Sequence, residues 1–165
     1  MIARYIGLGI LVGATWVGAY AQQTLSDLVE QANAGWMLGK WEAQIDSGTV
    51  TLEFSWDLDK QVVVLHGKTP DMEFKGYSAR DPMSATDVNY YGFDNRGAVT
   101  KGAWTLEGED LVLRIENRTS ERTTKMGVTF SGSANQGLIL GLHGIDSSGN
   151  LVTPARVERK FKKVK

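Results

Sequence analysis

The stretch that most constrains the fold runs from Trp36 to Trp56, because its apolar residues recur at every second position on both sides of a turn. In the first half, Trp41, Ala43 and Ile45 share one face. The second half places larger apolar side chains on one face: Val50, Leu52, Phe54 and Trp56. A period of two with one apolar face is typical of an antiparallel strand with one buried side. The Ser47-Gly48 turn therefore predicts a hairpin whose inner face packs against a core.

The same alternation continues to the end of the chain, which has 165 residues and is long enough for one domain. About eight to ten short strands are expected, separated by turns that contain glycine or aspartate. Hairpin-length turns without a long crossover favour an up-and-down barrel over a sandwich. We therefore expect an all-β fold in which residues 22–165 form a single antiparallel up-and-down β-barrel.

One short helix is expected before the first strand, over residues 24–34. Thr24 and Asp27 have the spacing of a capping box, in which two side chains satisfy backbone N–H groups at the helix start. The expected apolar stripe consists of Leu25, Leu28, Val29 and Ala32. Gly35 is the expected left-handed residue after the last turn. The stripe needs an apolar surface to cover, and one end of the barrel is the candidate.

Residues 1–21 have the features of a signal peptide. A short first region with Arg4 precedes an apolar run, which ends in the small-residue pattern Ala19-Tyr20-Ala21. The apolar run is shorter than the ~20 residues that a membrane span needs, although an uncleaved anchor is the alternative. We expect cleavage after Ala21 and a periplasmic or secreted protein.

The composition limits which classes of partner are expected and which interactions can stabilise the fold. The chain has no cysteine, so an exported form would depend on its apolar core rather than on disulfides. The formal net charge of −1 gives no electrostatic case for binding nucleic acid. The sequence gives no prediction of the oligomeric state.

The segment Gly39-Lys40-Trp41, on the first expected strand and just after a short helix, resembles the Gly-x-Trp signature of lipocalins and the wider calycin group. The pattern that continues to Trp56-Asp57 looks closest to lipocalin-like bacterial proteins of the DUF1579 type, a group of unknown function. This resemblance implies a lipocalin-like barrel that binds a small ligand.

The resemblance also implies how one end of the barrel is closed. Gly39 and Trp41 would form the closure, and an arginine from a late strand would cross the indole. Arg159 shares a face with Val157 and Phe161, so it is the expected partner. A guanidinium over an indole contributes roughly 0.5–2 kcal/mol.

Bulky aromatic side chains fall on the expected inner faces, and they either fill the barrel or line a pocket. The candidate lining residues are Trp56, Phe74, Tyr90, Trp104 and Phe130. Small residues on the same faces leave room or mark bends, namely Gly76, Gly92, Thr100 and Gly102. A contiguous pocket of roughly a few hundred Å³ would favour binding of a small apolar or amphipathic ligand. A solid core would favour a cell-envelope interaction protein that uses its outer face.

The chain has two histidines, His66 and His143, and each precedes a glycine at the end of an expected strand. In barrel proteins similar to nitrobindin a single histidine ligates haem iron, so either residue is a minor candidate for haem binding or catalysis. A catalytic role requires a histidine inside the pocket with a carboxylate within reach. No nucleophile, phosphate-binding or metal-ligand motif occurs, so we expect a protein without a catalytic site, a metal or a cofactor.

Basic residues cluster near the end of the chain: Arg156, Arg159, Lys160, Lys162, Lys163 and Lys165. Four of them, Arg156, Lys160, Lys162 and Lys163, would be the contact with an anionic membrane surface. The alternative is the solvated outer face of a closing strand, where charge resists pairing with other chains. We favour the alternative, because Val157 and Phe161 indicate a strand.

Overall fold

The computed structural model describes residues 23–164, so the predicted signal peptide and its cleavage site lie outside the described residues. The elements are α1 (Leu25–Gln31), η1 (Gly35–Met37), β1 (Gly39–Ile45), β2 (Gly48–Asp57), β3 (Val62–Lys68), β4 (Glu73–Arg80), β5 (Val88–Asp94), β6 (Val99–Glu107), β7 (Asp110–Arg118), β8 (Thr123–Ser133), β9 (Gly137–Gly144) and β10 (Val157–Lys163). Across the described part of the chain, no helix is long and apolar enough to cross a membrane.

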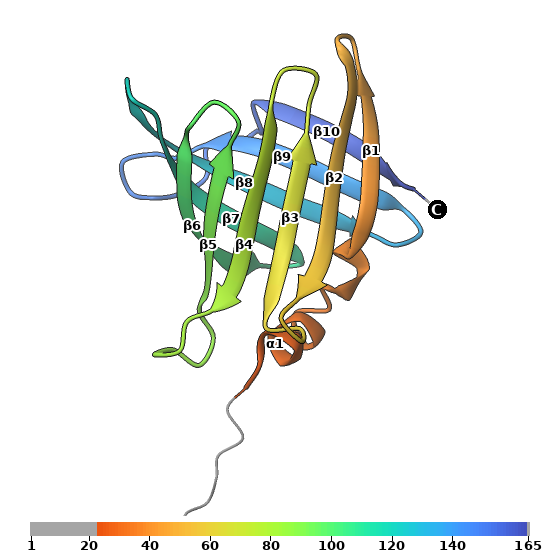
Figure 1. Cartoon of the computed structure of the whole chain (residues 1–165), viewed down its shortest axis with the longest axis vertical. Coiled ribbons are helices and arrows are strands. Elements are labelled where there is room, and N and C mark those ends of the chain that lie inside the picture. Colours follow the sequence, from red (N-terminus) through yellow and green to blue (C-terminus); the bar gives the residue numbers. More distant parts are fainter. Residues whose placement is uncertain (1–22, 165) are drawn as a thin grey trace, which may run out of the picture.

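The strands form one closed antiparallel barrel in which each strand pairs with the next along the chain (Figure 1). Closure comes from β1 and β10, where Trp41 lies opposite Lys163. The backbone N–H of Val164 adds a hydrogen bond of 2.8 Å to the Lys40 carbonyl. The predicted all-β up-and-down barrel with one short N-terminal helix is confirmed.

The hairpin of β1 and β2 has the register that the alternation predicts. Trp41 lies opposite Leu52, and Ala43 lies opposite Val50. All four side chains point inward, and Trp41 is fully buried with 0% of its surface exposed. The core of the barrel is centred on this hairpin and on the inner faces of β7 to β10.

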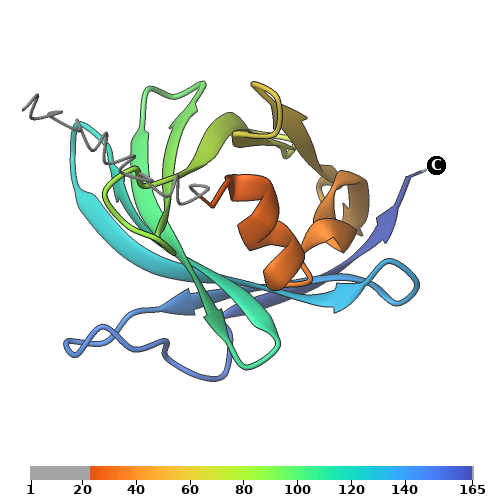
Figure 2. The same cartoon turned by 90° about the horizontal axis from the view of Figure 1, so that it is seen from below.

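Helix α1 begins as predicted but ends earlier. The capping box is present: the Thr24 N–H donates to Asp27 Oδ2 at 2.7 Å, and the Asp27 N–H donates to Thr24 Oγ1 at 3.2 Å. The left-handed residue after the helix is Asn33 at φ 49°, not Gly35, which begins η1. Asparagine adopts this conformation more readily than most other residues with side chains. Seen from below, α1 lies across the opening of the barrel (Figure 2).

The last predicted strand, residues 151–164, is shorter in the structure, because residues 145–156 form a loop on the outer face of the barrel. A side chain added at Gly127 would meet Leu151, and one added at Gly141 would lie 3.5 Å from the Ala155 methyl group. The absence of side chains at these two glycines therefore lets the loop pack closely on β8 and β9.

Candidate functional site: an apolar cavity beneath helix α1

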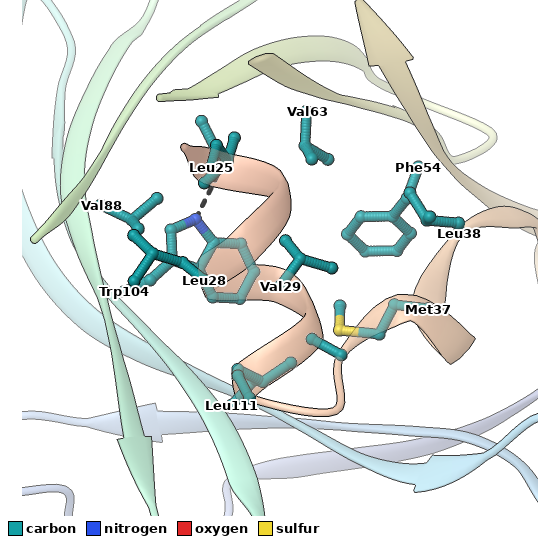
Figure 3. A pocket seen from close by; sticks show the side chains of 13 residues that line it. Leu25, Leu28, Val29, Met37, Leu38, Phe54, Val63, Val88, Trp104 and Leu111 are labelled. Carbon is teal, nitrogen blue, oxygen red and sulfur yellow. Dashed lines mark hydrogen bonds between the residues drawn. The ribbon is translucent and has the colours of Figure 1, made fainter. Parts of the chain in front are cut away.

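A cavity of about 110 Å³ lies between α1 and the barrel. Side chains from the helix, from η1 and from the six strands β2 to β7 point toward the same space (Figure 3). The lining residues are Leu25, Leu28, Val29, Ala32, Ala34, Met37, Leu38, Phe54, Val63, Ser78, Val88, Trp104 and Leu111. The helix thus forms one wall of the site and not only a cover over a finished core.

The cavity wall contains one pair of polar side-chain groups, and they bind each other. Trp104 Nε1 donates to Ser78 Oγ at 2.9 Å, and Ser78 is only 4% exposed. The hydroxyl of Ser78 keeps a proton that it can donate to one acceptor. With no charged residue in its wall, the cavity can hold apolar groups but does not compensate the desolvation of an ion.

Carboxylates lie on the outer side of the helix that covers the cavity. Asp27 and Glu30 are exposed on α1. The hydrogen bond from the Thr24 backbone, and then that from the Thr24 side chain, lowers the pKa of Asp27 below its usual value. Negative charge at this end disfavours an anionic head group on a bound ligand.

The size of the cavity limits what it can hold. Pockets for drug-sized molecules measure roughly 300–1,000 Å³, and a dry apolar cavity of about 150 Å³ is enough for benzene. At about 110 Å³, the cavity is smaller than the few hundred Å³ that would indicate a typical ligand site. It matches a short alkyl group or the apolar end of a larger molecule.

Among the candidate lining residues, only Trp104 lines this cavity. Tyr90 and Phe130 are buried in the core, and Phe74 packs against it. Trp56 lies near the end of β2, opposite Val63, outside the cavity wall. The structure brings Trp104 and Phe130 together, with ring centroids 5.3 Å apart.

The residues that sequence reasoning missed come mainly from the N-terminal segment. Leu28 and Val29 line the cavity from α1, and Met37 and Leu38 line it from η1 and the residue after it. The apolar stripe of the helix was the sequence feature that could have indicated them. The stripe predicts that the helix covers an apolar surface, but it does not predict a cavity between the two. Phe54 was predicted to face inward, but nothing in its alternation pattern separates a cavity wall from a packed core.

Away from α1, aromatic rings occupy the room that glycines leave. Phe74 lies over Gly67 on the neighbouring strand, where an added methyl group would be 2.1 Å from the ring. Tyr90 lies over Gly76 and Gly92: its hydroxyl oxygen would be 2.0 Å from a methyl group added at Gly76 and 2.8 Å from one added at Gly92. Burial raises the pKa of Tyr90 to about 12. These small residues therefore make room for side chains of the protein itself.

The other two small residues on the inner faces are also in close contact. A methyl group at Gly102 would lie 2.4 Å from the Arg114 carbonyl oxygen. Thr100 Oγ1 accepts a hydrogen bond of 2.9 Å from Asn117 Nδ2. Neither position adds to the cavity beneath α1.

The expected closure at Gly39 and Trp41 uses a different cation from the one expected. The ammonium of Lys163 lies 5.1 Å from the centre of the Trp41 ring and donates to the Trp36 carbonyl at 3.3 Å. Gly39 has φ 111°, and a Cβ atom added to Gly39 would lie 3.0 Å from Cε of Lys163. The Trp41 indole donates to the Met37 carbonyl at 2.7 Å.

Arg159 does not cross the indole, and the sequence prediction on this point is wrong. The register places Lys163 opposite Trp41, whereas Arg159 lies opposite Leu140. Four residues along a strand span about 13 Å, so Arg159 lies well away from the ring. Its guanidinium instead donates to the Glu158 carbonyl at 2.9 Å.

His66 lies on the outer face of β3 and is not in the cavity wall. Its Nε2 is 2.7 Å from Glu73 Oε1 on β4. The hydrogen bond from His66 lowers the pKa of Glu73, with smaller effects from the charges of His66, Lys68 and Lys75. His66 therefore forms a half-buried cross-strand pair with Glu73 on the outer face of the barrel.

His143 also faces outward, under the loop 145–156. Its Nδ1 is 3.1 Å from the Val152 carbonyl, and its Nε2 is 3.2 Å from Thr129 Oγ1. The carbonyl can only accept, so Nδ1 carries the proton. His143 thus ties the loop to the barrel wall.

Neither histidine lies inside the cavity, so neither meets the requirement for a catalytic histidine there. Within residues 23–164, no three acidic or histidine side chains gather into a possible metal site.

The four basic residues predicted to contact a membrane, Arg156, Lys160, Lys162 and Lys163, do not all share one face. Lys160 and Lys162 lie on the outer face of β10, where Lys162 is opposite Glu42. Lys163 turns toward Trp41, and the Arg156 guanidinium lies beside Gly144. A membrane contact through these four residues stays a prediction.

A scan against models of known protein families finds no match to this chain, and a search of curated protein sequences finds none either.

Proposed function

We propose that the protein is an exported, lipocalin-like binding protein that holds a small apolar ligand, or the apolar end of an amphipathic one, beneath α1. The observation that carries this proposal is the apolar cavity of about 110 Å³, whose wall contains no charged side chain. The resemblance at Gly39-Lys40-Trp41 to lipocalins and to the DUF1579-type group supports the same class of function. Export rests on the signal-peptide features of residues 1–21.

The expected ligand is neutral where it meets α1. Asp27 and Glu30 on the exposed side of the helix repel a carboxylate, whereas an alcohol can accept a hydrogen bond from Ser78. Burying about four methylene groups contributes about 3 kcal/mol, which corresponds to a dissociation constant in the millimolar range or above for a short alcohol. No chemical step is part of this function.

The test is a titration with 1-hexanol and with hexanoate, which share an alkyl chain and differ in charge. The indole N–H signal of Trp104 in the proton NMR spectrum reports on the cavity, and a Trp104→Phe variant assigns that signal. We expect hexanol to shift the signal with a millimolar dissociation constant and hexanoate to bind several-fold more weakly.

A cavity-filling variant locates the binding. Val29→Phe adds a ring from α1 into the cavity, whereas Gln31→Phe adds the same ring on the exposed side of the helix. We expect Val29→Phe to lose the hexanol shift and Gln31→Phe to keep it. If the wild-type protein shows no saturable shift, the second candidate is favoured, which is an interaction protein with a solid core. The aromatic rings that fill the interior away from α1 support this candidate.

A further inference from the structure

The outer wall of the barrel carries a group of exposed apolar side chains on β4, β5 and β6, which we call the aromatic wall: Tyr77, Tyr91, Phe93 and Val99. Tyr77 lies directly opposite Tyr91, and Phe93 lies directly opposite Val99. The three aromatic residues are 42%, 50% and 54% exposed. β4 and β5 are in front in Figure 1, so the view looks onto this wall. Large apolar side chains grouped on a surface usually mark a contact site.

The charges next to the aromatic wall are cationic. Lys75 lies opposite Phe93, and Lys101 lies opposite Tyr91 with its ammonium 5.8 Å from the ring centre. Neither lysine forms an ion pair with another residue of the described chain.

The nearby carboxylates, in contrast, are engaged. Glu73 pairs with His66 at 2.7 Å, and Glu116 pairs with Arg118 at 2.7 Å. Glu73 also lies opposite Lys68, and Glu116 lies opposite Lys101 and Lys125. Cations therefore outnumber carboxylates around the wall, and an anionic partner is electrostatically complementary to it.

The other exposed apolar side chains lack this combination: Val152, Val157 and Val164 bring no exposed aromatic ring, and the remaining three have no cationic surroundings of this kind. Leu58, Met83 and Leu106 are single residues at or beside the turns near α1. Carboxylates flank each of them in the sequence: Asp57, Asp59, Asp81 and Glu107. An anionic surface would be repelled at these turns, so the aromatic wall is the favoured face.

A second copy of the chain fits the wall less well than an anionic surface does. A two-fold contact would use the same residues on both copies. It would therefore bring Lys75 and Lys101 close to the same two lysines of the other copy, and like charges at an interface are unfavourable.

We propose that the aromatic wall docks on an anionic lipid bilayer. Tyrosine rings partition to the level of the lipid head groups, where the ring is buried and the hydroxyl meets water, and an apolar phenylalanine ring inserts at the boundary with the acyl chains. Lys75 and Lys101 would reach the phosphates from the same face. This binding surface is separate from the cavity and does not depend on the proposed ligand.

The test is co-sedimentation of the protein, as purified from its own cells, with lipid vesicles. One set contains phosphatidylcholine alone, and the other contains about one third phosphatidylglycerol, which gives the anionic surface. Wild type and variants carry the same N-terminus, so any binding through residues 1–21 is common to all of them. We expect binding to the anionic vesicles that decreases with salt.

Three double variants separate the possible contact faces. Lys75→Gln with Lys101→Gln should weaken binding to anionic vesicles by about fivefold per lysine. Tyr91→Ser with Phe93→Ser should abolish it, with an unchanged circular dichroism spectrum because both side chains are exposed. Lys160→Gln with Lys162→Gln removes the same charge from β10 and should leave binding unchanged.

Four outcomes would overturn the proposal. One is equal binding to both kinds of vesicle, and another is a wild-type level of binding by the aromatic variant. The third is a dimer in analytical ultracentrifugation that the aromatic variant loses, which would assign the wall to a second copy. The fourth is equally tight, variant-sensitive binding to soluble dextran sulfate, which would assign it to a polyanion rather than to lipid.

Discussion

The two ends of the barrel interior differ in how completely side chains fill them. Away from α1, aromatic rings fill the space beside several glycines, as Tyr90 on β5 fills the space over Gly76 on β4. At the α1 end, a seven-residue helix covers the opening and leaves about 110 Å³ empty. Neighbouring strands hold side chains in a fixed register, so that large and small residues can match one to one. A helix crosses strands with a different period, and its side chains do not match theirs in this way.

The strongest test of this difference adds one methyl group at each end. Gly76→Ala places a methyl group 2.0 Å from the Tyr90 hydroxyl oxygen and 2.1 Å from its ring, so the side chain must move, and we expect the free energy of unfolding to fall by about 3 kcal/mol. Val63→Ile adds a methyl group at the cavity wall, and we expect a change between zero and a gain of about 1 kcal/mol. Urea denaturation of both variants measures the difference.

A second substitution checks the cause. Tyr90→Leu removes the ring that Gly76→Ala would displace, so the double variant should lose less than the sum of the two single losses. Equal losses in Gly76→Ala and Val63→Ile would mean that both ends are equally well packed and would contradict the comparison.

The alternation of apolar residues was sufficient to predict the barrel, because a period of two is a local property of each strand. The pairing of Tyr90 with Gly76 was not predictable in the same way, since it depends on how β4 and β5 align. The register of β10 against β1 also determines which cation lies over the Trp41 indole. Lys163 and Arg159 share a face of β10, and only the alignment with β1 places Lys163 at Trp41.

The candidate site was predicted least well, for a related reason. Its wall combines one predicted aromatic residue, Trp104, with apolar side chains of α1. The stripe on α1 indicated that the helix contacts the barrel, but not that a cavity remains between them. The loop 145–156 shows the same limit, because Gly127 and Gly141 gave no sign in the sequence that a segment would pack on them.

The ring-filled end should also respond to alkaline pH. Burial raises the pKa of Tyr90 to about 12, compared with about 10 in an unfolded chain. The folded protein therefore keeps this proton where the unfolded chain loses it. The stabilisation is fully present below about pH 10 and is lost as the pH rises through 12, by about 3 kcal/mol in total.

Urea denaturation at pH 8, 10 and 11.5 measures this loss, and Tyr90→Phe is the control because it keeps the ring but has no group to ionise. We expect the variant to lose less stability than the wild type over this range. The ionisation of the lysines affects both proteins, so it cancels in the difference. An identical loss in both proteins would show that Tyr90 is not the buried group responsible.

The smallest expected effect concerns how the α1 end is closed. Lys163→Met keeps an unbranched chain over Gly39 but removes the charge above Trp41 and the hydrogen bond to the Trp36 carbonyl. Because Lys163 is exposed, we expect a loss of about 0.5–1 kcal/mol in urea denaturation. Arg159→Met is the matched control and should change the stability by less than about 0.5 kcal/mol. A larger loss for Arg159→Met would contradict the assignment of Lys163. A closing contact of this size is weak compared with the packing at the other end, because moving a ring away from Gly76 would first require unpacking the core.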